Sequence, residues 1–312
     1  MEMEYRELGS TGCRLSVIGF GGATLGGVFG ENEASVGRGA VHAAIDAGIN
    51  YFDVAPFYGF TLAEERLGQA LVGKRDQVFL SSKCARFGVK EFDFSGPRVA
   101  SSVEESLARL QTDHLDLLIV HDVEFGTQKQ VLEETIPAAL ALRDQGKVRF
   151  VGISGLPVRY LRKISESASI DAILSYAHYN LLNQQLDEVL AGYCAEQGVG
   201  LINASPLCLG LLTEGGPQKW HHASAEVKAV REPLIELCRK HGRNLSQVAL
   251  RFSLDNARVN TTLIGMSSAD EVAANLNVLE QTSDAALLAE IRQLVAPVHN
   301  QMWTEGLAEN NA

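Results

Sequence analysis

Four polar residues of this chain close or follow short apolar runs. The stretch 50–59, NYFDVAPFYG, ends an apolar strand at Asp53 and continues through a proline turn to Tyr58. Two later apolar runs end in the same way, at Lys83 and at His121. Parallel α/β folds place their chemistry at the carboxyl ends of strands. We therefore expect these four side chains to meet in one site.

A carboxylate, a phenol, an ammonium and an imidazole together predict proton transfer at a carbonyl or an alcohol. A tyrosine hydroxyl titrates near ~10 when unperturbed, and a neighbouring Lys83 ammonium is expected to lower the pKa of Tyr58. A buried lysine needs a carboxylate partner, and Asp53 is the candidate. His121 can orient a carbonyl or hydroxyl oxygen and relay a proton. The set holds no nucleophile and no metal cage, so the redox step requires a bound hydride carrier.

Composition narrows the classes of protein to consider. The chain has 312 residues and a formal net charge of −11, which argues against a nucleic-acid binder that follows phosphates. No apolar run approaches the roughly 20 residues that cross a bilayer, and the first residues lack the apolar core of a signal peptide. The five cysteines are scattered and never spaced as CxxC. We expect a cytoplasmic protein with neither a disulfide framework nor a zinc site.

The elements that must position the four residues alternate along the chain. Strands are predicted at 17–21, 49–53, 78–83, 115–121, 148–154, 172–176, 200–204 and 262–265. Helices are predicted at 34–47, 62–72, 98–111, 130–145, 157–167, 185–197, 226–241 and 268–279. Continuous apolar strands indicate burial on both faces, as in a parallel sheet. Eight strand–helix units in roughly 250 residues match a closed (β/α)8 TIM barrel.

The alternative fold is a doubly wound open sheet. It would require a GxGxxG motif after the first strand, and GFGGAT at 19–24 lacks the third glycine. Residues 4–16 predict an N-terminal β-hairpin that closes the bottom of the barrel. The segment 205–225 lacks periodicity and predicts a long loop over the catalytic, C-terminal face. No linker interrupts the pattern, so residues 1–312 are predicted to form one domain.

The motifs together resemble the aldo-keto reductase family over nearly the whole chain. They are NYFDVAPFYG, LSSKC around Lys83, HDVEFG from His121, VGISGLP, LSYAHYN, NASPLCLGLLTEGGPQKWHHAS and LIGMSSADEVAANL. The resemblance implies that Asp53, Tyr58, Lys83 and His121 form a catalytic tetrad, with Tyr58 as the general acid and base.

The resemblance also implies a nicotinamide dinucleotide site. Ser154 would contact the carboxamide, Ser205 and Leu207 would lie under the pyrophosphate, and the adenine end would rest on 265–275. The predicted cofactor-binding residues are Gly22, Ser154, Tyr176, Ser205, Leu207, Gly210, Gly265, Ser267, Glu271 and Asn275.

Two departures from the family pattern concern this cofactor. Many members stack an aromatic ring from the position before Ser-Pro-Leu, which is Ala204 here, so Tyr176 is the candidate for the ring face. Members that use NADP carry basic side chains near the start of the last barrel helix. This chain has Gly265 and Glu271 there, with no Lys or Arg between them. An acid repels a 2′-phosphate and accepts hydrogen bonds from a ribose hydroxyl, which predicts NAD.

These inferences predict an NAD-dependent aldose 1-dehydrogenase that forms an aldonolactone. The resemblance makes L-galactose the first candidate substrate and L-fucose, which differs at C6, the second. The predicted substrate-contacting residues are Phe57, Arg86, Asp122 and Trp220. We expect a small-molecule sugar as partner, without nucleic acid, membrane or metal, and a monomer or weak homo-oligomer.

Two alternative functions remain open at this point. One is an NAD(P)-dependent aldehyde reductase, or a dehydrogenase of another sugar or ring alcohol, with the same tetrad. The other is a regulatory subunit that binds cofactor without turnover. Of the remaining side chains, Glu64 and Glu65 are interpreted as helix surface, and His221 and His222 as a solvent-facing or substrate-contacting loop. Glu124 is interpreted either as a sugar contact or as loop scaffolding.

Overall fold

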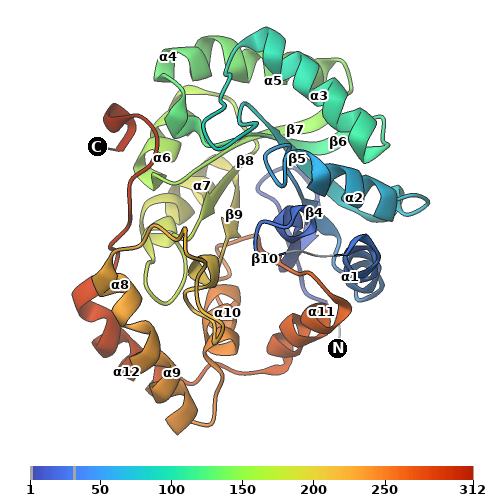
Figure 1. Cartoon of the computed structure of the whole chain (residues 1–312). Helices are drawn as coiled ribbons and strands as arrows, with labels where there is room; N and C mark the ends of the chain where they lie inside the picture. The colour runs from blue at the N-terminus through green and yellow to red at the C-terminus, as the bar shows by residue number, and fades with distance from the viewer. Residues whose placement is uncertain (1–2, 31–32, 312) are drawn as a thin grey trace.

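The computed structural model describes residues 3–30 and 33–311, and eight parallel strands close into a barrel (Figure 1). In chain order the strands are β3 (Ile18–Gly21), β4 (Tyr51–Asp53), β5 (Phe79–Cys84), β6 (Leu115–Val120), β7 (Val148–Gly155), β8 (Ala172–Tyr176), β9 (Gly200–Ala204) and β10 (Thr261–Gly265). Because β10 pairs with both β3 and β9, the sheet has no edge. The predicted TIM barrel is confirmed, and the open sheet is excluded.

The strands are apolar along their length because each of them is buried on both faces. All six residues of β6 are buried, as are all six of β5. One face of each strand packs against the helices and the other fills the barrel. The register places Asp53 beside Ser81, and Lys83 follows two residues later on the same face of β5. The polar ends of neighbouring strands therefore project into one opening.

Helices surround the barrel close to their predicted positions. They include α1 (Ala34–Asp46), α2 (Leu62–Ala70), α3 (Gly96–Leu110), α6 (Val158–Ser167), α7 (Gly192–Gln197) and α11 (Ala269–Leu276). The helix predicted at 130–145 begins with α4 (Gln128–Gln130), passes through the π-helical turn η4 (Val131–Thr135) and continues as α5 (Ile136–Asp144). The helix predicted at 185–197 begins with a second π-helical turn, η5 (Leu186–Ala191), before α7.

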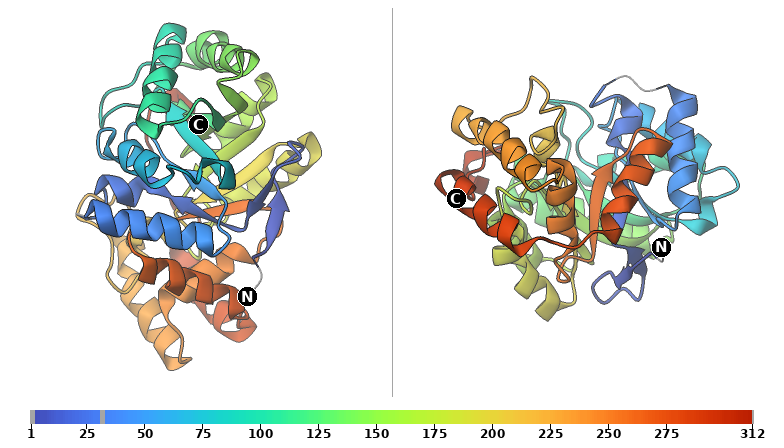
Figure 2. Two further views of the ribbon diagram at one scale, coloured as in Figure 1. Left: turned by 90° about the vertical axis from the view of Figure 1, so that its right-hand side faces the viewer. Right: turned by 90° about the horizontal axis from the view of Figure 1, so that it is seen from below.

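The region between β9 and β10 differs from the prediction. The segment 226–241 divides into α8 (Ala225–Ala229) and α9 (Arg231–Lys240), and a further helix, α10 (Leu245–Leu254), lies beside the barrel. Another unpredicted helix, α12 (Ala285–Val295), packs against α9 on the outside (Figures 1 and 2). Apolar residues of α9, α12 and the first part of α10 form a second cluster, whereas Leu250 and Leu254 of α10 belong to the main core around the barrel.

The N-terminal hairpin closes the amino end of the barrel, as predicted. Strands β1 (Tyr5–Glu7) and β2 (Arg14–Ser16) pair antiparallel and project at one end of the molecule in Figure 2. Leu8 between them is fully buried. Gly9 has a φ of +51°, and a Cβ there would lie 2.4 Å from the oxygen of Gly198, which follows α7 just before β9. This contact requires glycine because the two backbones touch.

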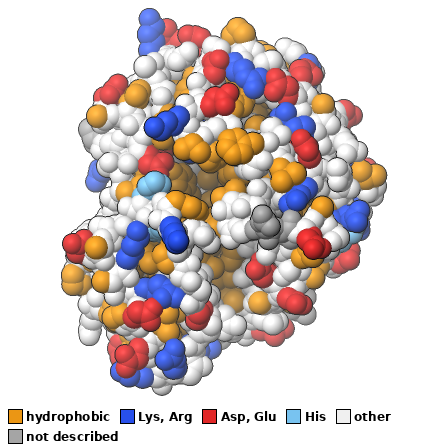
Figure 3. Space-filling model, in the orientation of Figure 1, with side chains coloured by type: hydrophobic (Ala, Val, Ile, Leu, Met, Phe, Trp, Pro, Cys, Tyr) orange, Lys and Arg blue, Asp and Glu red, His pale blue; other side chains and the backbone are white. Residues whose placement is uncertain are grey.

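At the other end the surface is hollowed between the lobe of α8, α9 and α12 and the rest of the molecule (Figure 3). Hydrophobic side chains line the hollow. Among the described residues, no helix is both long and apolar enough to cross a membrane. The prediction of a single domain over residues 1–312 stays a prediction.

Candidate active site

An ion pair lies at the centre of the barrel mouth. Lys83 Nζ donates to Asp53 Oδ2 at 2.5 Å and to the Val54 carbonyl oxygen at 3.0 Å. The two charged side chains are 1% and 4% exposed. Ser81 Oγ donates to the second carboxylate oxygen, Asp53 Oδ1, at 2.7 Å. Burial of both charges is tolerable because each is paired and hydrogen-bonded.

The loop after β4 presents Tyr58 to this ion pair. The Lys83 ammonium lies 4.8 Å from the centroid of the Tyr58 ring. The loop is pressed onto the turn after β3, since a Cβ on Gly59 would lie 2.3 Å from the Gly26 oxygen. Two glycines at this crossing let the backbones touch and hold the phenol in place. The non-glycine residues Phe60 and Thr61 both adopt positive φ directly afterwards.

His121 completes the group from the end of β6. Its ring stands perpendicular to the Tyr58 ring, with centroids 5.9 Å apart. The side chain is nearly buried, and its Nδ1 has no hydrogen-bond partner among the described residues. A buried polar atom without a partner is costly, so an oxygen of a bound substrate is a natural partner for this imidazole. The structure thus brings together all four side chains of the predicted tetrad.

The pKa of Tyr58 contradicts the expectation from sequence. Burial of the hydroxyl raises the pKa above its usual 10.0, and Lys83 opposes this without cancelling it. Lys83 itself has a raised pKa, since Asp53 and Tyr58 together outweigh the effect of its burial. The pKa of His121 is well below its usual value, chiefly because of burial and then because of the charges of Lys83 and Arg86. The resting site therefore holds a neutral phenol, an ammonium and a neutral imidazole.

Arg86, Asp122 and Phe57 line the next part of the mouth. The Arg86 guanidinium lies 4.0 Å from the Phe57 ring centroid and forms an ion pair with Asp122. Asp122 Oδ2 is also 3.7 Å from His121 Nε2. Burial raises the pKa of Asp122, while Arg86 opposes that shift. Three of the predicted substrate residues thus adjoin the tetrad.

Trp220, the fourth predicted substrate residue, lies elsewhere on the mouth. It is 43% exposed, and its ring packs against Phe29 at a centroid distance of 5.8 Å. Phe29 belongs to the loop after β3, so this contact joins two loops over the barrel. No ring contact links Trp220 to a tetrad residue within the described segments. Its role toward substrate stays a prediction.

Several predicted cofactor residues lie at the ends of other strands around the tetrad. Ser154 is buried near the end of β7, where its Oγ accepts from the Asp122 amide at 3.3 Å. Tyr176 ends β8. Gly22 abuts β4, because a Cβ on it would lie 2.8 Å from the Asp53 oxygen. These positions surround the tetrad from several strands.

The loop after β9 has an unusual backbone. Ser205, Cys208 and Leu209 have positive φ angles of 55°, 48° and 52°, and Gly210 has a φ of 93°. Non-glycine residues in this region carry strain, which concentrates at functional sites. Alternation of right- and left-handed residues turns successive N–H groups to one side and forms anion-binding concavities. Leu207, between Ser205 and Cys208, has φ −92° and ψ 17°, so this loop suits a pyrophosphate.

The start of α11 follows Gly265 at the end of β10. Ser268 caps the helix by accepting from the Glu271 amide at 3.2 Å. The Glu271 carboxylate turns back and accepts from the Ser267 amide and hydroxyl at 2.6 and 2.8 Å. Asn275 lies one turn further along the helix. The first turn thus carries acidic side chains and no basic one.

Two interpretations of polar pairs are each wrong for one residue and correct for the other. Glu64 is fully buried, and accepts from Arg109 Nε and Ser82 Oγ, both at 2.6 Å, whereas Glu65 lies on the surface. His221 is also buried, where its Nε2 lies 2.9 Å from the Cys208 oxygen and its Nδ1 accepts from the Ala223 amide. Only His222 of the histidine pair faces solvent.

Glu124 acts as loop scaffolding rather than as a surface for sugar. It is fully buried, and its Oε1 accepts from the Leu156 amide at 2.9 Å. Burial raises its pKa well above the usual value, and the charge of Asp122 adds to this. Its backbone oxygen accepts from the Leu307 amide and from Asn310 Nδ2, both at 2.9 Å. Glu124 therefore anchors the C-terminal residues to the barrel mouth.

The C-terminal tail, residues 299–311, is the part of the site that sequence reasoning missed. It brings Trp303 and Glu305 to the mouth, where Trp303 Nε1 donates to Glu305 Oε1 at 3.1 Å. The available signal was a tryptophan and a glutamate in a segment without helical periodicity. The residues of such a segment do not show which part of the barrel they contact, so the tertiary structure is needed to place them.

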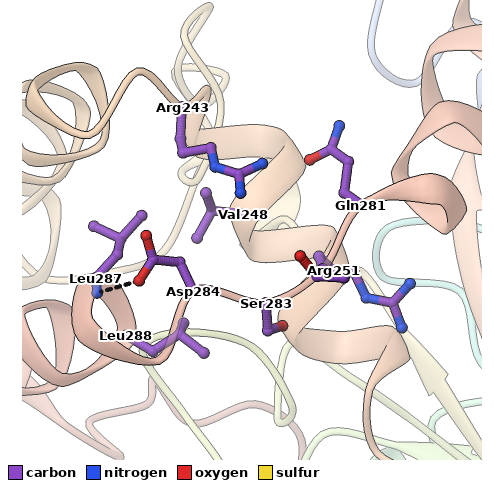
Figure 4. Close-up of a pocket in the computed structure, with 9 residues that line it drawn as sticks. Arg243, Val248, Arg251, Gln281, Ser283, Asp284, Leu287 and Leu288 are labelled. Carbon is purple, nitrogen blue, oxygen red and sulfur yellow. Dashed lines mark hydrogen bonds between the residues drawn. The ribbon is translucent and has the colours of Figure 1, made fainter.

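A small cavity of about 20 Å³ lies away from these residues, between α10 and the start of α12 (Figure 4). Arg243, Arg251 and Asp284 border it. Asp284 is already engaged as the helix cap, since its Oδ1 accepts from the Ala286 and Leu287 amides at 3.0 Å. The cavity contains no residue of the predicted site and is smaller than a sugar.

A barrel with a tyrosine, lysine, aspartate and histidine at its mouth defines a family of oxidoreductases. The chain belongs to the aldo/keto reductase family, whose family model matches residues 17–296. Members of this family bind a nicotinamide cofactor. The resemblance seen in the sequence is confirmed.

Comparison with individual proteins gives the relatives within that family. The chain is 41% identical over 320 residues to L-galactose dehydrogenase of Arabidopsis thaliana, with 99% of each chain covered. It is 29% identical over 313 residues to D-threo-aldose 1-dehydrogenase of Pseudomonas sp, covering 91% of this chain and 95% of the relative. The solved holo form of an aldo-keto reductase from Bacillus halodurans matches with a TM-score of 0.78, 28% identity and 100% of both chains covered.

Proposed function

We propose that this protein is an NAD-dependent aldose 1-dehydrogenase that oxidises the C1 hydroxyl of a sugar to an aldonolactone. The observation that carries the proposal is the Tyr58 ring, whose centroid lies 4.8 Å from the buried Lys83 Nζ and which stands perpendicular to the His121 ring. Two relatives that align along most of the chain are named for aldose substrates. The five free cysteines, four of them buried, also support a cytoplasmic location.

Each member of the tetrad has a separate task in this proposal. Tyr58 first loses its own proton to water, and the phenolate, stabilised by the Lys83 ammonium, then accepts the proton of the C1 hydroxyl. Asp53 keeps Lys83 charged despite its burial. His121, a neutral imidazole, donates a hydrogen bond that orients the substrate oxygen. All four groups stand on strand ends or on a glycine-locked loop, so they are positioned before substrate arrives.

The residues present fit a dinucleotide. The loop that carries Ser205, Leu207 and Gly210, with strained backbone at Ser205, Cys208 and Leu209, would hold the pyrophosphate, and Ser154 would hold the nicotinamide carboxamide. Tyr176, at the end of β8, is proposed to supply the ring face that Ala204 lacks. A nicotinamide ring bound at the mouth would take the hydride from C1.

The proposed preference for NAD rests on Glu271. Its carboxylate is fixed by Ser267 at the start of α11, where a 2′-phosphate would meet negative charge and no basic side chain of the first turn. We expect a higher kcat/KM with NAD than with NADP, and Glu271→Lys should shift the ratio toward NADP by about tenfold. Glu280→Lys makes the same change of charge at an exposed residue beyond the end of α11 and serves as the control. A wild-type enzyme that is more efficient with NADP contradicts the proposal.

The neutral and charged groups beside the tetrad support a polyhydroxylated substrate. Asp122 and Arg86 can accept from and donate to sugar hydroxyls, while Phe57 covers one side of the guanidinium. L-galactose is the first candidate because of the relative with that name, and L-fucose is the second. A monomer or weak homo-oligomer remains the expectation.

A sugar panel tests the proposed reaction. Initial rates with L-galactose, L-fucose, D-arabinose and L-glucose should be followed by the absorbance of reduced cofactor, with NAD and with NADP. We expect turnover of at least one aldose and formation of the lactone. Reduction of aldehydes without oxidation of any sugar would favour the aldehyde-reductase alternative. Cofactor binding without any turnover would favour the regulatory subunit.

A further inference from the structure

The C-terminal tail crosses three loops of the barrel mouth. Near its start, Asn300 Oδ1 accepts from the Gln184 amide at 2.8 Å, in the loop after β8. In the middle, the Trp303 ring meets the His221 ring at 5.4 Å, in the loop after β9. Near its end, the Leu307 amide donates to Glu124 in the loop after β6. The tail is the red chain that runs from α12 to the C-terminus in Figure 1.

These anchors fix the carboxylate of Glu305 beside the substrate residues. Trp303 Nε1 donates to Glu305 Oε1 at 3.1 Å, and His222 Nε2 lies 3.9 Å from the same oxygen. The next residue, Gly306, touches the loop directly, since a Cβ there would lie 2.4 Å from the Glu124 oxygen. The Glu305 side chain is only 18% exposed, so most of it is shielded from open solvent. Its negative charge acts on Arg86, Asp122 and Tyr176.

Arg86, a cation near the tetrad's ion pair, is already neutralised. Arg86 could bind a carboxylate or phosphate of a substrate, but its guanidinium is paired with Asp122. Glu305 then adds a negative charge that no described ion pair with Lys or Arg balances. Near this group, the nearly buried His121 keeps an Nδ1 without a partner, which indicates that a ligand oxygen completes the site. An anionic ligand would therefore meet a guanidinium that is already paired and a Glu305 carboxylate without a Lys or Arg partner among the described residues.

We propose that Glu305 is a specificity-determining residue that selects uncharged aldoses over anionic ones. Its carboxylate accepts hydrogen bonds from sugar hydroxyls and repels a substrate that carries a carboxylate or phosphate. This inference rests on the proposed aldose oxidation and adds the substrate class. It also separates sugars that share the same reacting C1 group, since a uronic acid differs from its parent sugar only at C6.

The test compares L-galactose with L-galacturonate on the NAD-loaded enzyme. The wild type should prefer the neutral sugar, in Kd by calorimetry and in kcat/KM, and Glu305→Gln should narrow that preference by about tenfold. The glutamine amide oxygen still accepts from Trp303 Nε1, so the tail stays in place. Glu309→Gln, an exposed acid on the same tail, is the matched control and should leave the preference unchanged.

A second readout needs no variant. If charge repulsion causes the selection, raising the ionic strength from about 0.05 to about 0.5 M should weaken the wild-type preference. Equal affinity of the wild type for both sugars, a preference unchanged in Glu305→Gln, or one insensitive to salt would overturn the inference.

The binding arm separates this inference from the proposed function. If the enzyme binds the neutral sugar but oxidises no aldose, the proposed reaction fails while the Kd ratio still decides the role of Glu305. If neither sugar binds the NAD-loaded enzyme, both proposals are overturned.

Discussion

Two buried ion pairs lie on opposite faces of strand β5. Inside the barrel, Lys83 pairs with Asp53 at 2.5 Å. Outside the barrel, in the layer of helices, Arg109 of α3 pairs with the fully buried Glu64 of α2 at 2.6 Å. The two distances and the burial of the two carboxylates are nearly equal, although the Arg109 side chain is 17% exposed and that of Lys83 only 1%. Only the inner pair belongs to the candidate active site.

Consecutive serines of β5 serve the two pairs. Ser81 donates to Asp53 at 2.7 Å, and Ser82 donates to Glu64 at 2.6 Å. Side chains alternate across a strand, so neighbouring residues of one sequence stretch face the barrel interior and the helices. Lys83 then returns to the interior. Burial and hydrogen bonding of a charged side chain therefore do not by themselves indicate that the residue is catalytic.

What distinguishes the inner pair is its next neighbour. Lys83 faces the Tyr58 ring at 4.8 Å, and Tyr58 is only half-buried at the mouth. Arg109 instead donates a further hydrogen bond to Ser106 Oγ, which lies 3.2 Å away in the same helix. The inner cation thus acts on a titratable group that substrate can reach. The outer cation joins two helices to the barrel.

Removing the inner cation should produce the largest effect. Lys83→Met leaves the phenolate of Tyr58 without its stabilising charge, and we expect kcat to fall by about 10³-fold. It also leaves Asp53 buried and unpaired, which costs about 3–5 kcal/mol of stability. Steady-state kinetics and urea unfolding measure the two effects. Near-normal kcat in a folded variant would remove the central role of this ion pair.

Removing the outer cation should cost stability alone. Arg109→Met leaves Glu64 buried and unpaired, and we expect a loss of about 3–5 kcal/mol in the free energy of unfolding. The kcat per folded molecule should stay within about twofold of the wild type, since nothing in the tetrad changes. If the kcat of this variant falls as far as that of Lys83→Met, the distinction between a catalytic inner pair and a structural outer pair is wrong.

The pH dependence should also follow the inner pair. Oxidation needs Tyr58 as a proton acceptor, and burial raises its pKa above 10.0. The oxidation rate should therefore increase with pH from about 7 to about 10, whereas carbonyl reduction, which needs the protonated phenol, should not. The profile of Arg109→Met should match the wild type. An oxidation rate that is flat over this range would contradict the proposed role of Tyr58.

The serine pair allows the smallest and most closely matched test. Ser81→Ala removes a donor to Asp53 and should lower kcat several-fold, together with a stability loss of about 1–3 kcal/mol. Ser82→Ala removes the equivalent donor to Glu64 and should lower stability by a similar amount with kcat unchanged. Equal kcat values for the two variants would show that hydrogen bonding to Asp53 does not tune the inner pair.

Local sequence patterns predicted most of the barrel, but they did not predict helices α10 and α12, which lie outside it. All eight strands were predicted, because continuous apolar runs bounded by glycines are a strong local signal. Helices α10 and α12 were not, since they pack on α9 outside the strand–helix repeat. The C-terminal tail has no periodicity, so its tryptophan and glutamate did not indicate by themselves that Glu305 lies at the mouth.

The sequence by itself determined the barrel and which side chains end its strands, since strand periodicity and parallel pairing bring Asp53, Lys83 and His121 to one end. The tertiary structure alone decided the electrostatics. Glu64 and Glu65 are adjacent in sequence, yet only Glu64 is buried, because Arg109 lies against it 45 residues further on. Tyr58 was expected to be acidified by Lys83, but its pKa is raised. The sign of that shift depends on how much water the fold removes, and desolvation is a property of the packed molecule.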